Sequence, residues 1–262
     1  MTSKTEPRLL CYDLGEGVTA FSTTRHGGVS EANYASFNIN PYCGDSADHV
    51  ARNRQLLADR LGLPASHIGL PHQVHGIEHR AVAPELLDMS DVVRDKILDG
   101  VDMVTTSMTG VCIGVSTADC IPVLLYDPVA RATAAIHAGW RGTLQRICQR
   151  AVMAMQLHYG TTPDRLRAVV GPGISLANFE VGQEVYDQFV QAGFDLTDTA
   201  EWHTKWHLDL PGINIRELIG CGVAPEHIHH AGICTFDHAD DYFSARRLGI
   251  DSGRIYTGIL MR

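Results

Sequence analysis

The centre of the chain reads Ala118-Asp119-Cys120-Ile121-Pro122-Val123-Leu124-Leu125-Tyr126-Asp127-Pro128, a strand-like apolar run between polar residues. A second run follows in Ala135-Ile136-His137-Ala138-Gly139-Trp140-Arg141-Gly142-Thr143. A cysteine and a histidine therefore each lie at the boundary of a rigid element, where side chains are well placed to enter a pocket. Cysteine with histidine serves as a metal-binding pair or as nucleophile and base. We expect the active site in this segment.

Other short apolar runs predict that these two strands belong to a sheet. Residues 101–106, 111–116, 121–127 and 132–137 form consecutive runs bounded by Gly, Pro, Asp or Thr, and residues 18–24, 166–170 and 228–234 add further strands. Helices are predicted from Ser46 to Gly62, across the apolar stripe of 144–155, and around 181–192. Because several strands follow one another without a helix between them, a mixed or antiparallel arrangement is favoured over a regular parallel one. The predicted fold is α/β of the α+β type, one layered domain over residues 1–262 with mixed β-sheets flanked by helices.

Composition limits the classes of partner and location. Lys plus Arg total 21 and Asp plus Glu total 30, and the net charge of −9 argues against nucleic acid binding. The seven cysteines contain no Cys-x-x-Cys pair, and the polar N-terminal segment 1–14 lacks the apolar core of a secretory signal. No stretch is long enough to span a membrane. We expect a cytoplasmic protein, monomeric because no coiled-coil pattern or long exposed apolar stripe stands out.

Most of the 14 histidines are expected to be structural, including those at 49, 67, 158, 203, 227, 229 and 230. His72 and His75 lie in a short extended segment and should point to opposite faces, so only one can join a given site. His75, Cys120 and His137 together would supply two imidazoles and a thiolate, a set that holds catalytic zinc with one position open. Two other interpretations stand beside this one: Cys120 and His137 act as nucleophile and base of a cysteine hydrolase, or Cys120 is a small buried side chain.

Two arginines at strand ends are candidates for binding an anion. Arg25 leaves the strand of residues 18–24, and Arg141 follows the strand that contains His137. The guanidinium group offers paired donors, and a helix opening at Thr143 would favour an anion near Arg141. Either arginine could also neutralise Asp119. The segment Gly171-Pro172-Gly173 lacks the glycine spacing and lysine of a nucleotide-binding loop.

Motifs along nearly the whole chain resemble those of the polyphenol oxidase (laccase) domain family, whose members are also described as purine nucleoside phosphorylases and peptidoglycan editing factors. They include Thr24-Arg25-His26-Gly27-Gly28, Phe37-Asn38-Ile39, Gln73-Val74-His75-Gly76, Asp102-Met103-Val104-Thr105, Thr117-Ala118-Asp119-Cys120, Ile136-His137-Ala138-Gly139-Trp140-Arg141-Gly142-Thr143 and Phe243-Ser244-Ala245-Arg246-Arg247.

The resemblance implies a zinc ion held by His75, Cys120 and His137. It also implies phosphorolysis of adenosine, inosine, guanosine and methylthioadenosine, and deamination of adenosine. The older family description implies copper-dependent phenol oxidation, but multicopper oxidases need several copper centres and the sequence offers one good site. Arg25 and Arg141 are our candidates for binding phosphate, Asn38 for contacting purine or ribose, and Asp119 for orientation or acid–base chemistry.

The chain departs from the family pattern at two positions. The segment Ser175-Leu176-Ala177-Asn178 lacks a cysteine that is common near Ala177 and Asn178, and Ala245 lies where a tyrosine is frequent. Chemistry that needs the extra thiol is therefore not expected. Three alternatives to the phosphorylase remain: a copper-dependent phenol oxidase, a cysteine hydrolase or peptidoglycan editing factor that uses Cys120 and His137, and a non-catalytic binding protein.

Overall fold

The computed structural model describes residues 6–262, so the first residues of the polar N-terminal segment lie outside it. A six-stranded sheet has the spatial order β13 (Ile228–His230), β9 (Arg167–Val170), β7 (Ile121–Asp127), β8 (Ala132–Ala138), β5 (Met103–Thr106) and β4 (His79–Ala81). A five-stranded sheet has the order β1 (Leu9–Tyr12), β2 (Val18–Thr23), β14 (Ile255–Met261), β6 (Cys112–Thr117) and β3 (Ile68–Gly69). A small third sheet contains β10 (Glu180–Val181), β12 (Trp206–Leu208) and β11 (Ala200–Trp202).

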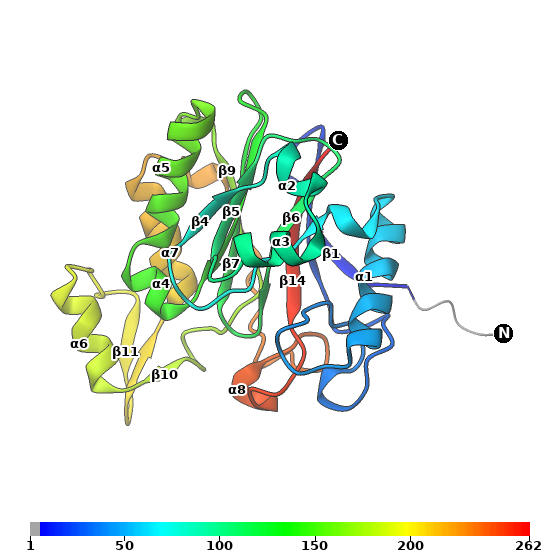
Figure 1. Cartoon of the computed structure of the whole chain (residues 1–262). Coiled ribbons are helices and arrows are strands. Elements are labelled where there is room, and N and C mark those ends of the chain that lie inside the picture. The colour runs from blue at the N-terminus through cyan, green and yellow to red at the C-terminus, as the bar shows by residue number, and fades with distance from the viewer. Residues whose placement is uncertain (1–5) are drawn as a thin grey trace.

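Helices cover the outer faces of the two large sheets (Figure 1). The helices are α1 (Ala47–Leu61), α2 (Pro84–Asp88), α3 (Asp91–Ile97), α4 (Trp140–Leu144), α5 (Ile147–Tyr159), α6 (Gln183–Gln191), α7 (Leu210–Gly220) and α8 (Ala245–Leu248). Helices α4, α5 and α7 lie against the six-stranded sheet, while α1 lies beside the five-stranded sheet. The predicted class, mixed sheets flanked by helices, is confirmed.

The central strands are buried on both faces because the two large sheets also pack against each other. In β7, Ile121, Val123 and Leu125 contribute to the core shared with α5 and α7. The alternate residues Leu124 and Tyr126 contribute to the core between the sheets. Burial on both faces explains why β7 reads as a continuous apolar run without polar alternation.

Two predicted elements differ in their bounds. The stripe at 144–155 is not one helix, because Arg146 adopts a left-handed conformation (φ 60°) and separates α4 from α5. The predicted strand 228–234 ends at His230, and only an isolated bridge pairs Cys234 with Gly173.

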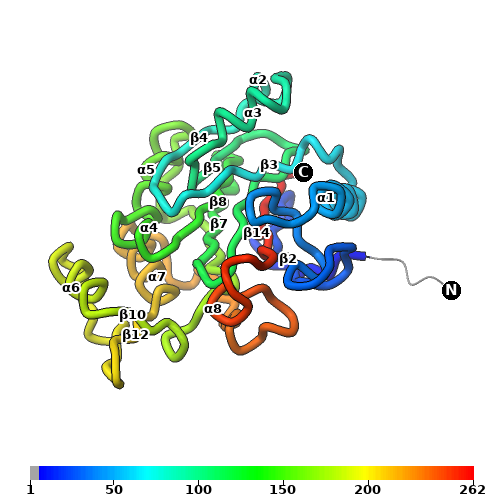
Figure 2. The backbone as a smooth tube through the Cα atoms, turned by 60° about the horizontal axis from the view of Figure 1, so that its bottom comes forward, coloured from blue at the N-terminus to red at the C-terminus, as the bar shows by residue number. Residues whose placement is uncertain are grey.

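The small third sheet and α6 project from one side of the molecule, whereas α8 and the beginning of β14 lie near the ends of β7 and β8 (Figure 2). No helix within residues 6–262 combines the length and apolar character needed to cross a bilayer.

Candidate metal centre and cavity

Strand register brings Cys120 next to His137. In the antiparallel pair β7–β8, Ile121 lies opposite Ala138 and Pro122 opposite His137. The residue just before β7 therefore reaches the end of β8, although 17 positions separate the two in the sequence. This register builds the cysteine–histidine pair that the sequence predicted.

The neighbouring strand β5 adds Asp102, which the sequence analysis did not identify as part of the site. Met103 pairs with Ile136, and the His137 amide donates to the Asp102 carbonyl at 2.8 Å. The Asp102 carboxylate is fully buried, and its Oδ1 lies 2.6 Å from His137 Nδ1. An acidic residue at the start of a wholly buried strand was the available signal, because a buried carboxylate needs partners.

The same carboxylate holds the loop that carries His75. It accepts hydrogen bonds from the backbone amides of Val74 (3.2 Å), His75 (3.0 Å) and Gly76 (2.7 Å). His75 itself has a φ of 64°, in the left-handed region that few non-glycine residues adopt. The loop is therefore not the regular extended segment that the sequence suggested, and Asp102 stabilises its unusual backbone.

His75, Cys120 and His137 offer ligand atoms that all lie within 4.8 Å of one another. Within residues 6–262, no other set of three or more His, Cys, Asp or Glu side chains lies close enough together to hold a metal ion. Because Nδ1 of His137 is engaged by Asp102, its Nε2 is the ring nitrogen left for a metal. Two imidazoles and one thiolate on one side of an open cavity fit a zinc ion with a free coordination position.

Gly139, which directly follows β8, allows the three side chains to lie close together. A Cβ atom on Gly139 would lie 3.1 Å from Cys120 Sγ and 3.1 Å from His75 Cδ2. A larger residue at position 139 would displace Cys120, His75 or both.

The charges of the group reinforce one another. Burial alone would raise the pKa of Cys120, but the charge and hydrogen bond of His137, together with His75, lower it to about 6. Burial alone would lower the pKa of His137, but the Cys120 thiolate and Asp102 raise it to about 9. A thiolate at neutral pH is the form that binds a metal cation.

The group opens into a cavity of about 820 Å³. Its walls carry aromatic, polar and cationic side chains, among them Tyr42, His72, Gln73, Ser116, Thr117, Phe179, Arg246 and Arg254. The Gln73 side chain exchanges two hydrogen bonds with the Ser116 backbone, at 2.7 and 2.8 Å, and so fixes the His75 loop to β6. His72 lies in the same wall, stacked on Tyr42 with a centroid separation of 4.3 Å.

Asp119 lines the cavity, but neither Arg25 nor Arg141 is its partner. Its Oδ1 accepts from the Thr235 hydroxyl at 2.7 Å, and its Oδ2 accepts from the Arg246 amide at 2.6 Å. Its φ of 84° places the carboxylate between these two donors. Asp119 therefore ties α8 to the segment that carries Cys120.

The structure does not bring the two predicted phosphate-binding arginines into the cavity. Arg25 donates from Nε to the Ala35 carbonyl at 2.8 Å and from Nη1 to the Ala239 carbonyl at 2.6 Å. Arg141 is exposed, with its guanidinium 4.3 Å from the centre of the Trp140 ring. Thr143 does not open a helix either, since it is buried within α4 and contacts Asn214.

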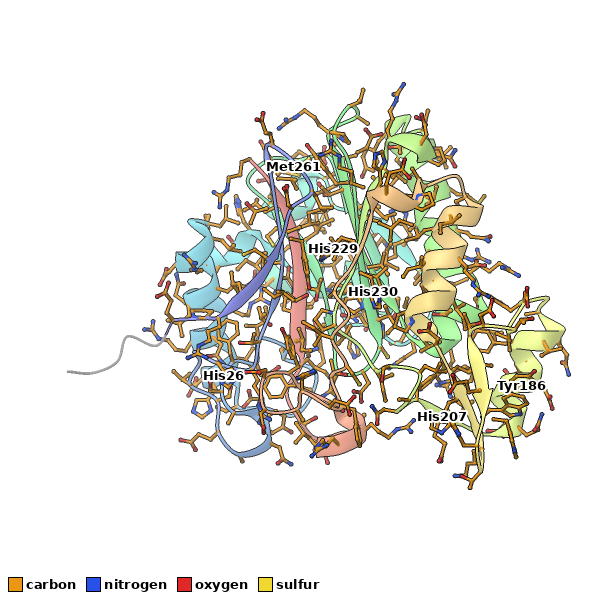
Figure 3. All side chains as sticks on the ribbon, turned by 180° about the vertical axis from the view of Figure 1, so that it is seen from behind. His26, Tyr186, His207, His229, His230 and Met261 are labelled. Carbon is orange, nitrogen blue, oxygen red and sulfur yellow. The ribbon has the colours of Figure 1, made fainter. Side chains whose placement is uncertain are left out.

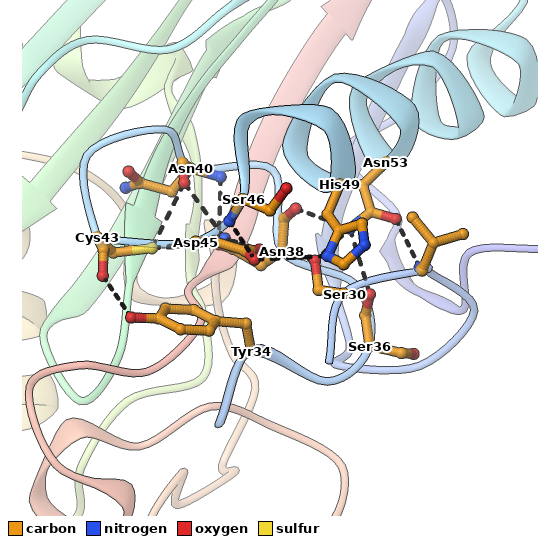
Figure 4. A network of polar contacts seen from close by, with 11 residues as sticks. Ser30, Tyr34, Ser36, Asn38, Asn40, Cys43, Asp45, Ser46, His49 and Asn53 are labelled. Carbon is orange, nitrogen blue, oxygen red and sulfur yellow. Dashed lines mark hydrogen bonds and ion pairs between the residues drawn. The ribbon is translucent and has the colours of Figure 1, made fainter. Parts of the chain in front are cut away.

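Asn38 is also buried away from the cavity, in a polar network that shapes one of its walls (Figure 4). Its Nδ2 donates to Asp45 at 2.9 Å and to the Asn40 carbonyl at 3.2 Å. Its Oδ1 accepts from the backbone amides of Asn40 and Arg254. Asn38 thus holds the loop with Asn40 and Cys43 and the backbone of Arg254, all of which line the cavity.

The other histidines of the described residues form close pairs at most, with ring centroids 5.3 Å apart for His79 and His158 and 5.0 Å apart for His203 and His207. Figure 3 shows His26, His207 and the pair His229 and His230 on separate parts of the molecule.

One departure from the family pattern lines the cavity, and the other lies between the lining residues Ile174 and Phe179. Ala245 is one of the lining residues. Ser175 and Asn178, the two ends of the segment that lacks a cysteine, both hydrogen-bond to the Cys234 sulfur. A further cysteine, Cys43, lines the cavity, and no sequence pattern indicated this because its position depends on the Asn38 network.

Comparison with known proteins gives consistent similarities over almost the full length. A family model described as multi-copper polyphenol oxidoreductase laccase matches residues 19–262. A purine nucleoside phosphorylase of Bacteroides thetaiotaomicron is 44% identical over 247 residues, covering 93% of this chain and 92% of that protein. A protein named adenosine deaminase RL5, from an unknown prokaryotic organism, is 40% identical over 248 residues, covering 93% and 94%. The crystal structure of the Bacillus licheniformis hypothetical protein YfiH superposes with a TM-score of 0.90 at 28% identity, covering 98% and 97%.

Proposed function

The chain belongs to the family described as multi-copper polyphenol oxidoreductase laccase, and we propose that it acts as a zinc-dependent purine nucleoside phosphorylase with adenosine deaminase activity. The proposed substrates are adenosine, inosine, guanosine and methylthioadenosine, with phosphate as the second substrate. The observation that carries the proposal is the group His75, Cys120 and His137, oriented by Asp102 and open to a cavity of about 820 Å³.

Each ligand has a role that its contacts support. Cys120 supplies a thiolate, and His137 and His75 supply imidazole nitrogens, so a bound divalent cation would be held by three protein ligands. The chemistry that zinc supplies in such a site is Lewis-acid activation of water or of a polar substrate atom. Asp102 fixes the orientation of His137 and of the His75 loop, and Asp119 holds α8 at the cavity rim as an orienting residue.

The two reactions differ in what must enter the cavity. In phosphorolysis, a phosphate oxygen forms a bond to C1′ of the ribose as the bond from C1′ to the purine nitrogen breaks. The base leaves with the bonding electrons and takes up a proton. In deamination, water adds to C6 of adenosine and ammonia leaves. Polar and cationic side chains line the cavity and are available to the substrates of both reactions. Only the first reaction consumes phosphate.

One observation favours a second candidate, a cysteine hydrolase. Cys120, His137 and Asp102 follow the order of nucleophile, base and orienting acid found in cysteine and serine hydrolases. His75 argues for the metal instead, because a hydrolase of that type has no use for a second imidazole beside the thiolate. A multicopper oxidase is less well supported, since it needs several copper centres and residues 6–262 gather one such group.

The test is to incubate protein of measured metal content with adenosine, with and without phosphate, and to separate the products by chromatography. We expect adenine to form only with phosphate, and inosine to form without it. Cys120→Ala should abolish both products, whereas Cys11→Ala, which removes an exposed thiol in β1, should keep them.

Other outcomes would overturn the proposal. Zinc-loaded protein that turns over no nucleoside would contradict it. Amide hydrolysis by metal-free protein, blocked by alkylation of Cys120, would support the hydrolase. Oxygen uptake with a thiolate-to-copper absorption band would support the oxidase.

A further inference from the structure

One part of the cavity carries arginines without a carboxylate partner. Arg246 on α8 and Arg254 just before β14 both line it. Within residues 6–262, the arginines that form ion pairs are others, namely Arg60, Arg80, Arg94, Arg146 and Arg216. In a chain with nine more acidic than basic side chains, two unpaired arginines in one cavity indicate a place for an anion.

Arg246 lies close to the group formed by His75, Cys120 and His137. Its backbone amide donates to Asp119 Oδ2 at 2.6 Å, and Asp119 directly precedes the ligand Cys120. Its Nη2 donates to the Glu180 carbonyl at 3.2 Å, and its guanidinium lies 5.7 Å from the centre of the Phe179 ring. These contacts fix the side chain and leave its Nε and Nη1 without an acceptor in the described part of the chain.

Arg254 is held by neutral groups only. Its Nη1 donates to the Ser252 and Gly253 carbonyls at 2.6 and 3.0 Å, and its Nη2 donates to the Ile250 carbonyl at 2.9 Å. Carbonyl oxygens orient a guanidinium but do not neutralise its charge. The cation is therefore preorganised at the cavity wall.

Two neighbouring residues of the cavity lining carry buried hydroxyl groups. Ser116 and Thr117, at the end of β6, are 5% and 1% exposed and both line the cavity. Neither hydroxyl oxygen has a hydrogen-bond partner in the described residues. An unpaired buried hydroxyl is unfavourable, and because successive side chains of a strand point to opposite faces, one of the two is on the side where a ligand in the cavity would supply an acceptor atom.

We propose that this face of the cavity is the binding subsite for a phosphate dianion. It consists of Arg246 and Arg254, with the end of β6 at Ser116 and Thr117 beside them, and it replaces Arg25 and Arg141, whose guanidinium groups lie elsewhere. The inference rests on the proposed phosphorolysis, in which phosphate must reach the ribose beside the metal group. A guanidinium provides the paired donors that a tetrahedral oxyanion accepts.

The test compares Arg246→Gln and Arg246→Lys with Arg247→Gln as the matched control. Arg247 is the next residue on the same helix, is exposed, and contacts the Phe236 carbonyl and ring instead of the cavity. In zinc-loaded protein, Arg246→Gln should raise the KM for phosphate about 10- to 100-fold, as expected for the loss of a hydrogen bond between charged groups. The ratio of adenine to inosine formed in one reaction should fall by a similar factor. Arg246→Lys should lie between, and Arg247→Gln should match the wild type.

Arg254→Gln is the second variant, and its melting temperature must be measured because it also loses three backbone contacts. If neither Arg246→Gln nor a folded Arg254→Gln changes the KM for phosphate more than Arg247→Gln does, the subsite is wrong.

A binding measurement separates this inference from the proposed function. If zinc-loaded protein turns over no nucleoside, inorganic phosphate should still raise the melting temperature of the wild type more than that of Arg246→Gln. No stabilisation of the wild type by inorganic phosphate would overturn the subsite. Stabilisation by adenosine monophosphate but not by inorganic phosphate would also overturn it, because the phosphate group would then belong to a nucleotide.

Discussion

Asp102 joins two of the proposed metal ligands through a single buried carboxylate. It accepts from the ring of His137 and from the backbone of the loop that carries His75. A metal site of this kind depends on such outer contacts almost as much as on its ligands, because they fix the ring orientation and the tautomer.

We therefore expect Asp102→Ala to weaken zinc binding about 10- to 100-fold. Asp102→Asn should rescue little, since its amide NH2 would face the backbone donors of Val74 and Gly76. Competition with a chromophoric chelator measures the affinity, and the absorption spectrum of the cobalt-substituted protein reports the ligand geometry. Asp241→Asn is the matched control, because Asp241 contacts His26 in an exposed pair. Unchanged zinc affinity and cobalt spectrum in Asp102→Ala, with a lower melting temperature alone, would reduce Asp102 to a structural residue.

A second test of the proposed metal group uses Gly139. In Gly139→Ala the new Cβ would lie 3.1 Å from atoms of both Cys120 and His75, so at least one ligand must shift. We expect weaker zinc binding and a changed cobalt spectrum. Gly220→Ala on α7, where a Cβ meets nothing within 4 Å, should leave both unaltered. Equal behaviour of the two variants would show that the ligands tolerate the methyl group.

The sequence located the candidate metal ligands better than the anion contacts. Cys120 directly precedes β7 and His137 lies near the end of β8, and the pairing of these strands brings the two residues together, so local pattern carried the information. The direction of an arginine depends on loops from elsewhere: Arg25 binds carbonyls at positions 35 and 239, and Arg246 is placed by Asp119. No periodicity encodes those contacts.

At the scale of elements, a hydrogen-bonded chain joins β4, β5 and α5. His79 Nε2 lies 2.8 Å from Thr105 Oγ1, which lies 2.9 Å from the Tyr159 hydroxyl. Burial lowers the pKa of His79 to about 4, helped by the nearby His158 and Arg80. The neutral imidazole is thus the form that the native packing favours.

This pKa predicts a loss of stability in acid. The unfolded chain has a histidine pKa of about 6.5, so between that pH and about 4 it binds more protons than the native state. The His79 contribution is therefore complete above about pH 6.5 and is lost as the pH falls toward 4. Allowing for partial exposure, we expect about 1–2 kcal/mol. Urea unfolding of wild type and His79→Gln at pH 7 and pH 5 should give a smaller pH effect in the variant. The exposed His203→Gln should retain the wild-type difference, and a His79→Gln protein that also retains it would contradict the assignment.

Elements with a clear local pattern were predicted well, and those that depend on distant partners were not. Helix α1 follows its apolar stripe from Ser46 to Gly62, and the four central strands lie within a residue or two of their predicted bounds. The break at Arg146 escaped prediction because the apolar stripe continues across it, while the backbone turns at one residue. Strand β14 also escaped, although it pairs with both β2 and β6 at the centre of its sheet.

At the scale of the whole molecule, the sequence predicted mixed sheets flanked by helices but not their layering. Which sheet packs on which depends on contacts such as those of Ile259 from β14 with the inter-sheet core that also contains Leu124 and Val169. Those residues lie far apart in the sequence, and each belongs to a strand that is buried on both faces. Hydropathy alone therefore could not assign them to one core.

Metal binding should stabilise the molecule as a whole, because the three ligands come from separate segments. His75 lies in the loop between β3 and β4, Cys120 precedes β7, and His137 lies near the end of β8. A ligand that binds only the native state adds about 2.7 kcal/mol when its free concentration is 100 times its dissociation constant. For a chain of this size that corresponds to a rise in melting temperature of roughly 5–10 °C.

We expect chelator-treated wild type to melt lower by that amount and to recover when zinc is restored. Cys120→Ala should melt at the same temperature with and without zinc, since the loss of the thiolate leaves two imidazoles that hold the ion weakly. Cys11→Ala should respond as the wild type does. Scanning calorimetry with metal analysis of each sample makes the comparison. If the wild type melts identically in chelator and in zinc, His75, Cys120 and His137 do not act as a metal site in the folded chain, and the pair Cys120 and His137 would have to be explained as nucleophile and base.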